Sequence, residues 1–164
     1  MTYELRRRGY DVEAQPTYSN DVWPQVAYTT REGARLGRWR GAFRDAKTDY
    51  VGVRGSTANT ARGEEKVLKN IADKMKSYGD GARAIVNFAY RGRGIGHVFN
   101  VEKTKGGMVF VDAQSGERYT AADMRNFAKV WNTASVSLTR TDNLRVSDRV
   151  KNFVWNRDER KRSH

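Results

Sequence analysis

The chain has 164 residues, which is the size of one ordinary domain, and its composition includes no cysteine. With 31 Lys and Arg residues against 19 Asp and Glu residues, its net charge is +12, which favours phosphate-rich or acidic partners. The lack of cysteine excludes a disulfide framework, a Cys-ligated zinc site and a thiol nucleophile within these residues. No apolar run approaches the roughly 18 residues of a membrane span, and the Met1 region lacks the apolar core of a signal peptide. We therefore expect no membrane partner, and we expect no metal or cofactor.

The first part of the chain combines one helix with a long irregular segment. Good helix formers run from residue 2 to residue 8 and stop at Gly9, which predicts the tail of a helix that begins at or before Met1. Residues 13–62 are predicted to be irregular, because prolines and glycines interrupt them. Large aromatic side chains are expected to anchor this segment to the core: Trp23, Trp39 and Phe43. Trp39 lies between two arginines, so stacking on nucleic-acid bases is the alternative interpretation.

From Gly63 onward the pattern is regular. Apolar residues recur at helical spacing until the chain meets Gly79, which predicts a helix with these side chains on its buried face: Val67, Leu68, Ile71, Met75 and Tyr78. Three apolar runs follow, and each is predicted to be a strand: residues 84–90, 97–101 and 108–112. A turn with two glycines at residues 104–107 predicts that the last two runs form a tight antiparallel hairpin.

The last part of the chain is predicted to add one short helix and one strand to this sheet. The segment that starts at Thr120 resembles a capping arrangement and opens a helix with one apolar side: Met124, Phe127, Val130 and Trp131. A strand is predicted over residues 135–139 and a terminal helix over residues 147–155. The basic residues 157–164 are expected to form a flexible tail after a single domain at residues 1–156. Helices packed on a small antiparallel β-sheet make this an α+β fold.

The predicted hairpin brings one histidine and one carboxylate together. The chain has two histidines, and His97 lies at the start of a strand. Thr104 is expected to face Gly107 across the turn. This register places Asp112 opposite Phe99 and diagonal to His97, so that imidazole and carboxylate share one face of the sheet, whereas a slip of one residue would separate them. A carboxylate beside an imidazole fixes the tautomer of the ring, as activation of a nucleophile requires.

Plainer interpretations of these residues stay open. His97 could be a partly buried strand residue whose ring makes an ordinary hydrogen bond, and Asp112 could support the turn that follows its strand. The glycine-rich residues 92–96 superficially resemble a phosphate-binding loop, but they lead into a strand rather than a helix. We interpret them as a flexible connection that lets substrate approach His97. Ser56 has no neighbour in sequence that would activate it, so its segment is interpreted as a plain loop.

Three blocks of the sequence follow one another in a recognisable order. The first is Tyr-Glu-Leu-Arg-Arg-Arg-Gly-Tyr-Asp-Val-Glu-Ala at residues 3–14, and the second is Tyr-Gly-Asp-Gly-Ala-Arg at residues 78–83. The third combines Gly-His-Val-Phe-Asn-Val at residues 96–101 with Val-Asp-Ala-Gln-Ser-Gly at residues 111–116. Together they resemble the papain-fold toxin domain of bacterial polymorphic toxins and phage minor head proteins, which is often described as a glutamine deamidase.

The resemblance implies a papain-like fold and a Cys-His-Asp site that hydrolyses the side-chain amide of a glutamine in a target protein. It implies that His97 is the general base and that Asp112 orients it. Gln114 belongs to the same motif, without an assigned catalytic role.

The family's nucleophile does not occur in this chain. In the family a cysteine lies in an Asn-Cys segment just ahead of the Tyr-Glu-Leu-Arg block, where this chain has Met1 and Thr2. Our hypothesis is that the chain was cut a few residues after the nucleophile, naturally or by design. Neither Thr2 nor Ser19 has a context that makes it a substitute, so the chain alone is expected to be inactive or nearly so.

Two classes of function compete at this point. The first is a cysteine deamidase that acts on a glutamine of a protein substrate, with proteolysis and transglutamination as alternatives that would use the same triad. The second is a non-enzymatic basic module of a phage particle or toxin that binds nucleic acid or an acidic protein. A cognate immunity protein is a further candidate partner. The expected location is a phage virion or, for a bacterial effector, the cytoplasm of a target cell.

Overall fold

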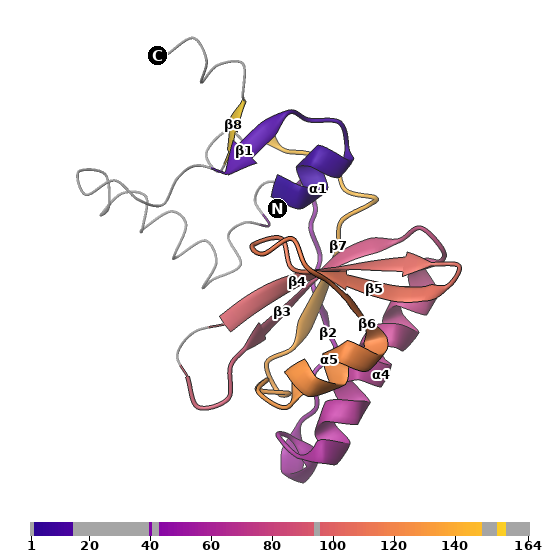
Figure 1. Ribbon diagram of the computed structural model, residues 1–164, viewed down its shortest axis with the longest axis vertical. Coiled ribbons are helices and arrows are strands. Elements are labelled where there is room, and N and C mark those ends of the chain that lie inside the picture. Colours follow the sequence, from indigo (N-terminus) through magenta and orange to yellow (C-terminus); the bar gives the residue numbers. More distant parts are fainter. Residues whose placement is uncertain (1, 15–39, 41–42, 94–95, 149–153, 157–164) are drawn as a thin grey trace, which may run out of the picture. The chain divides into compact units, whose positions relative to one another are not determined.

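A computed structural model describes residues 2–14, 40, 43–93, 96–148 and 154–156 of the chain (Figure 1). The chain divides into two compact units, one formed by residues 1–46 with 144–164 and the other by residues 47–143. Some of the predictions concern residues that lie outside the described part: Ser19, Trp23, Trp39 and residues 157–164.

The unit formed by the two ends of the chain contains a helix and a two-stranded sheet. Helix α1 (Thr2–Arg7) confirms the predicted amino-terminal helix, and the chain leaves it at Gly9, whose φ of 84° is one that glycine adopts without strain. Strand β1 (Val12–Ala14) pairs antiparallel with β8 (Val154–Asn156). Phe43, which was expected to anchor the irregular segment, is buried, with 3% of its surface exposed.

The carboxyl-terminal end differs from its prediction. The sequence predicts a terminal helix over residues 147–155, but residues 154–156 form the strand β8, and residues 149–153 are not among those described. Pairing with β1 supplies backbone partners to Val154 and Trp155, two residue types that favour extended structure. Because this partner lies at the other end of the chain, local periodicity could not indicate it.

The unit of residues 47–143 is built on a six-stranded sheet in which every neighbouring pair of strands is antiparallel. Its strands are β2 (Asp49–Tyr50), β7 (Ser137–Arg140), β3 (Arg83–Ala89), β4 (Gly96–Thr104), β5 (Gly107–Val111) and β6 (Arg118–Thr120), in their order across the sheet. The predicted strands β3, β4, β5 and β7 are confirmed. The two edge strands, β2 and β6, are too short to show a period in the sequence, and they were not predicted.

Helix α4 (Ala61–Tyr78) confirms the most regular pattern of the sequence. Its predicted apolar face is buried at Val67, Ile71 and Met75. The Thr60 side chain caps the first turn by accepting a hydrogen bond from the Gly63 amide at 3.2 Å. A short 3-10 helix, η3 (Gly55–Thr57), precedes it. None of the described helices combines the length and the apolar character that a bilayer span requires.

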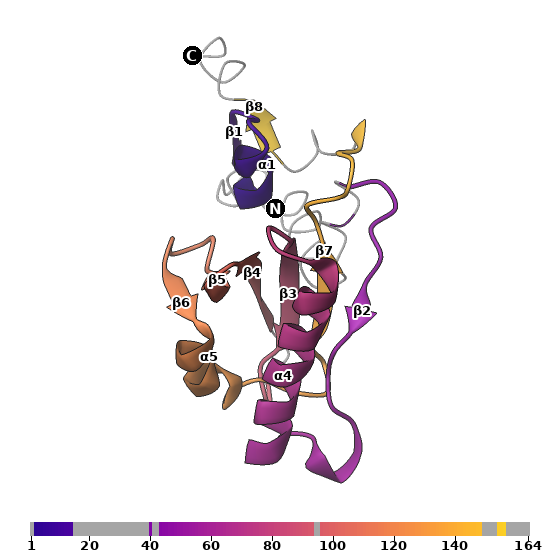
Figure 2. The same cartoon turned by 90° about the vertical axis from the view of Figure 1, so that its right-hand side faces the viewer.

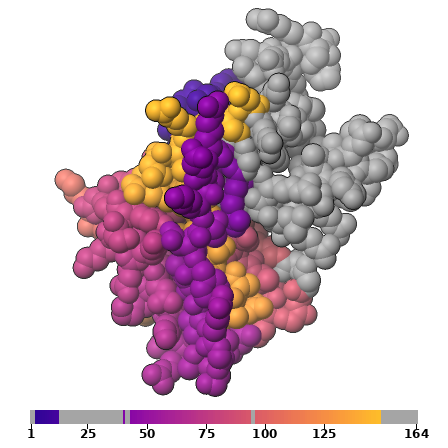
Figure 3. All heavy atoms as spheres, turned by 180° about the vertical axis from the view of Figure 1, so that it is seen from behind, coloured from indigo at the N-terminus to yellow at the C-terminus, as the bar shows by residue number. Residues whose placement is uncertain are grey.

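Polar side chains fix α4 to the edge of the sheet. Tyr78 donates a hydrogen bond to the Asp49 carboxylate, and Lys74 Nζ lies 3.0 Å from Asp49 Oδ1. Burial and the Asp49 carboxylate raise the pKa of Tyr78 above its usual value, so its hydroxyl stays a donor. Figure 2 shows α4 running along the sheet, and in Figure 3 the purple residues of β2 and of the segment after it lie beside the magenta residues of α4.

Helix α5 (Ala121–Ala128) begins as predicted. Thr120 and Asp123 form a reciprocal capping box, in which the Thr120 hydroxyl accepts from the Asp123 amide and the Asp123 carboxylate accepts from the Thr120 amide. The helix ends before Val130 and Trp131, however. Trp131 is fully buried as expected, whereas Val130 is 50% exposed, so the prediction that it lies on the apolar face is wrong.

The two helices and one face of the sheet share a single core. Alternate residues of β3 point into it, namely Ala84, Val86 and Phe88, and Phe99 and Val101 do so from β4. Helices α4 and α5 supply the opposite side of the core. The predicted α+β architecture of helices on a small antiparallel sheet is therefore confirmed.

Gly63 lies in the first turn of α4 at a point where a side chain has no room. A Cβ atom at this position would lie 2.1 Å from the carbonyl oxygen of Thr57. Alanine normally stabilises a helix interior by up to about 1 kcal/mol relative to glycine. We expect Gly63→Ala to do the reverse and lower the free energy of unfolding by roughly 1 to 3 kcal/mol, measured by urea unfolding.

The control for this substitution is Gly106→Ala, because the nearest atom to a Cβ at Gly106, the Thr104 Oγ1, is 3.9 Å away. This variant is expected to change the free energy of unfolding by no more than about 0.5 kcal/mol. A Gly63→Ala protein as stable as the unsubstituted chain would contradict the close packing of the η3 turn against α4.

Candidate active site

His97 and Asp112 occupy the positions that the predicted hairpin register gives them. Strands β4 and β5 pair with Thr104 opposite Gly107 and with Asn100 opposite Val111, which confirms that register. His97 is the second residue of β4, and Asp112 directly follows the last residue of β5. Both side chains point to the face of the sheet that carries the core.

The two side chains are joined by a hydrogen bond. His97 Nε2 and Asp112 Oδ2 are 2.8 Å apart, and the side chains are only 14% and 15% exposed. With the carboxylate as acceptor, Nε2 carries a proton and Nδ1 is left as the basic nitrogen of the neutral ring. Within the described part of the chain, Nδ1 has no hydrogen-bond partner. A structural role and a catalytic role of His97 would both include this hydrogen bond. Only a measurement of enzymatic activity distinguishes the two roles.

Asp112 performs a second task in the turn after β5. Its Oδ1 accepts a hydrogen bond from the Gln114 amide at 2.8 Å, and its carbonyl accepts one from the Gly116 amide at 2.8 Å. Burial alone would raise the pKa of Asp112, but the Gln114 amide and the His97 ring outweigh burial and lower that pKa below its usual value. The carboxylate is thus ionised, and both of its oxygens accept a hydrogen bond. Gln114, which had no assigned role, contributes through its backbone.

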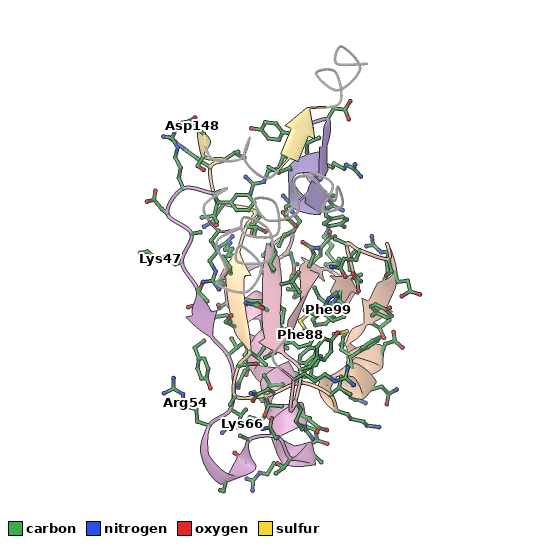
Figure 4. All side chains as sticks on the ribbon, turned by 90° about the vertical axis from the view of Figure 1, so that its left-hand side faces the viewer. Lys47, Arg54, Lys66, Phe88, Phe99 and Asp148 are labelled. Atoms are coloured by element: carbon green, nitrogen blue, oxygen red, sulfur yellow. The ribbon has the colours of Figure 1, made fainter. Side chains whose placement is uncertain are left out.

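A wall of aromatic rings supports the imidazole. His97 lies opposite Phe88 in the sheet, with ring centroids 6.2 Å apart, and its ring meets Phe99 edge-on at 5.0 Å. Figure 4 labels Phe88 and Phe99, whose rings stack at 5.9 Å on neighbouring strands. Trp131 stacks on Phe88 with ring centroids 4.4 Å apart. These contacts restrict the ring to the orientation in which Nε2 meets the carboxylate.

Gly96 has a role that the sequence interpretation missed. It was grouped with the glycines that let substrate approach His97, but a Cβ atom on Gly96 would lie 2.3 Å from the Phe88 carbonyl oxygen. A glycine is therefore needed here for the close approach of β3 and β4, next to the histidine. Residues 94–95 of the same loop are not among those described. A glycine at the first position of a predicted strand was the available signal for such an approach.

Ser56, the other candidate within this unit, does not join the site. Ser56 lies in η3, and no histidine or carboxylate contacts it among the described hydrogen bonds. Thr2 begins α1 in the other unit. The described residues also contain no group of three His, Asp or Glu side chains that could hold a metal ion.

The fold and the site agree with the class of papain-like α+β domains. The sheet is antiparallel, the helices cover its core face, and a His–Asp pair lies at one end of a hairpin. Comparison with protein families agrees with this class. Residues 2–117 match the model of the family described as papain fold toxin 1, glutamine deamidase, and this match covers more than half of the chain. The chain therefore belongs to that family. No curated protein matches it.

The ionised state of Asp112 makes a testable contribution to stability. Because the pKa of this carboxyl is lowered by folding, its stabilising effect is fully present above the usual value of about 3.9 and is lost as the pH falls through the lower folded value. We expect Asp112→Asn to lower the free energy of unfolding by about 1 to 3 kcal/mol at pH 7. The deficit should shrink as the pH falls from 5 to about 2.5, as measured by urea unfolding at each pH.

Asp73→Asn serves as the matched control, since Asp73 makes an exposed ion pair with Lys69. Its effect should stay within about 0.5 kcal/mol at every pH. A constant deficit for Asp112→Asn across this pH range would contradict the assignment of an ionised, hydrogen-bonded carboxylate.

Proposed function

We propose that His97 and Asp112 are the general base and its orienting residue in a cysteine-dependent deamidase that acts on a protein glutamine. The observation that supports this proposal is the 2.8 Å contact that occupies Nε2 of His97 and leaves Nδ1 as the base. Membership of a glutamine deamidase family supplies the reaction class. A domain of this family acts on a protein substrate.

The chemistry follows from the two nitrogens of the ring. Nδ1 takes the proton of a cysteine thiol, and the thiolate sulfur forms a bond to the side-chain amide carbon of the glutamine. The carbon–nitrogen bond then breaks, and ammonia leaves with the proton from Nδ1. Water attacks the resulting thioester while Nδ1 accepts its proton, and the carbon–sulfur bond breaks. The departing thiolate regains a proton from Nδ1, so that the net reaction converts an amide and water into a carboxylate and ammonium. Asp112 stabilises the imidazolium formed in each half of the cycle.

The 164 residues contain no cysteine, so the thiolate of this mechanism must come from outside them. The chain by itself is proposed to be inactive as a deamidase. As a member of a toxin family, it is proposed to act as an effector in the cytoplasm of a target cell, delivered by a bacterium or carried by a phage particle. A cognate immunity protein is the partner that such an activity would require in the producing cell.

The test restores the nucleophile. A longer protein that carries a cysteine ahead of Tyr3 is expected to release ammonia from a mixture of glutamine-containing peptides, and each product should gain about 1 Da. In that protein, His97→Ala should lower kcat by about 10²- to 10⁴-fold, because proton transfer at Nδ1 is lost. Asp112→Asn should also lower kcat, because the ring loses its preferred tautomer.

The second histidine of the chain provides the control, and His164→Ala should leave kcat unchanged. Peptide cleavage without release of ammonia would show that the reaction is proteolysis and not deamidation. Ammonia release that survives His97→Ala would reject the role proposed for the pair, and ammonia release by the 164-residue chain itself would reject the need for an external thiolate.

A second candidate function is a non-enzymatic basic module that binds nucleic acid, and the net charge of +12 is the observation that favours it. Neutralised phosphates release counterions, so such binding weakens steeply with salt. If this function holds, the affinity of the chain for a 20-nucleotide single strand should fall about tenfold or more between 50 and 200 mM salt, as measured by fluorescence anisotropy. Affinity that does not change over this range would argue against it.

A further inference from the structure

A basic cleft opens at the end of β3, close to the His–Asp pair. It has a volume of about 400 Å³ and is lined by Tyr90, Arg91, Arg93, Lys129 and Val130. We call it the Tyr90 cleft. Such a volume lies near the small end of the roughly 300–1,000 Å³ typical of ligand sites, so it suits one or two side chains of a bound chain.

The walls of the Tyr90 cleft are held by backbone contacts. Tyr90 forms a β-bridge with Trp131, and the Arg91 amide donates to the Val130 carbonyl at 2.8 Å. The Arg93 amide donates to the Tyr90 carbonyl at 3.3 Å. The bridge and the Arg91 bond join the turn after β3 to the segment after α5, and the Arg93 bond closes the turn itself. The charged side chains therefore extend from a fixed backbone, and they can be exchanged without removing a core residue.

The charge of the Tyr90 cleft is only partly neutralised. Arg91 Nη2 lies 2.8 Å from Glu64 Oε1, which leaves the other two cations of the cleft to be balanced. Lys129 donates to the neutral Asn126 side chain at 3.2 Å. No acidic group in the described part of the chain pairs with Arg93 or Lys129. Two cations beside a tyrosine ring and the half-exposed Val130 favour a ligand with carboxylates and some apolar surface.

The Tyr90 cleft lies on the same face of the sheet as the proposed base. Tyr90 meets Phe88 edge-on with ring centroids 5.5 Å apart, and Phe88 in turn lies 6.2 Å from the His97 ring. Residues that alternate along a strand share a face, at about 3.3 Å per residue. An extended peptide with its glutamine at His97 would thus reach the cleft within roughly two to four residues.

We propose that the Tyr90 cleft binds an acidic segment of the substrate protein, two to four residues from the glutamine that is deamidated. This inference rests on the proposed function, since it assigns a specificity subsite to the same site. Because Glu64 already pairs with Arg91, only Arg93 and Lys129 are left for a ligand. Two cations suit one or two separate carboxylates better than a continuous phosphate backbone. The cleft thereby selects glutamines in an acidic sequence context.

The binding test uses the 164-residue chain and two fluorescent decapeptides. Each peptide has one central glutamine, and the acidic peptide carries four glutamates on one side of it where the other carries four serines. The acidic peptide should bind at least about tenfold more tightly at low salt. The double variant Arg93→Glu with Lys129→Glu should lose about tenfold or more of that affinity, measured by fluorescence anisotropy.

The matched control is Lys76→Glu with Lys105→Glu, which changes the net charge by the same amount at two exposed lysines away from the cleft. It should alter affinity less than about twofold, since exposed charges beyond the Debye length of about 10 Å are screened. Equal losses in the two double variants, or equal affinity for the two peptides, would overturn the proposal. Loss of single-stranded DNA binding without loss of peptide binding in the cleft variant would assign the cleft to nucleic acid instead.

An activity test separates this proposal from the proposed function. In the longer protein that contains the cysteine, the cleft variant should raise KM for the acidic peptide about tenfold and leave kcat unchanged, because it touches no reacting atom. If neither peptide releases ammonia, the deamidase function is rejected. The anisotropy measurement then still tests whether the Tyr90 cleft binds the acidic peptide. If both double variants release ammonia with the same KM, the role of the Tyr90 cleft as a substrate subsite is rejected and the deamidase function is retained.

Discussion

The hydrogen bond between His97 and Asp112 depends on the register of a single hairpin. Strands β4 and β5 pair with Thr104 opposite Gly107, and this pairing brings imidazole and carboxylate to one face at 2.8 Å. A shift of one residue would turn one of the two side chains to the opposite face. The turn after β5 reinforces the arrangement, because the oxygen of Asp112 that does not meet the ring is held by the Gln114 amide.

The same side chains build the core and orient the site. Phe88 and Phe99 are members of the core that α4 and α5 cover, and both also contact the His97 ring. The close approach of β3 and β4 at Gly96 belongs to this arrangement as well, because a side chain there would meet the Phe88 carbonyl. The packed sheet therefore sets the orientation of the ring and fixes the direction of Nδ1, as the proposed role in proton transfer requires.

Charge is distributed unevenly around the pair. The carboxylate of Asp112 neutralises the side of the ring at Nε2, while cations line the Tyr90 cleft at the end of β3. In the proposed mechanism Asp112 stabilises the imidazolium, and in the proposed subsite the cations attract an acidic segment of the substrate. The net charge of +12 extends this attraction over the whole protein. It favours an acidic protein and a nucleic acid alike as binding partners, which is why both are candidate partners.

Local pattern by itself determined the helix at α4, the start of α5, the strands β3 to β5 and the hairpin register, because each depends on residues close in sequence. From that register it also predicted that His97 and Asp112 share a face. The other elements did not follow from local pattern. β8 was predicted as a helix because its partner β1 lies at the other end of the chain. The edge strands β2 and β6 are too short to show a period, and Val130 was predicted on a buried face although α5 ends before it. Only the tertiary structure decided β2, β8, the aromatic wall and the Tyr90 cleft, since each of these arises where segments far apart in the chain meet.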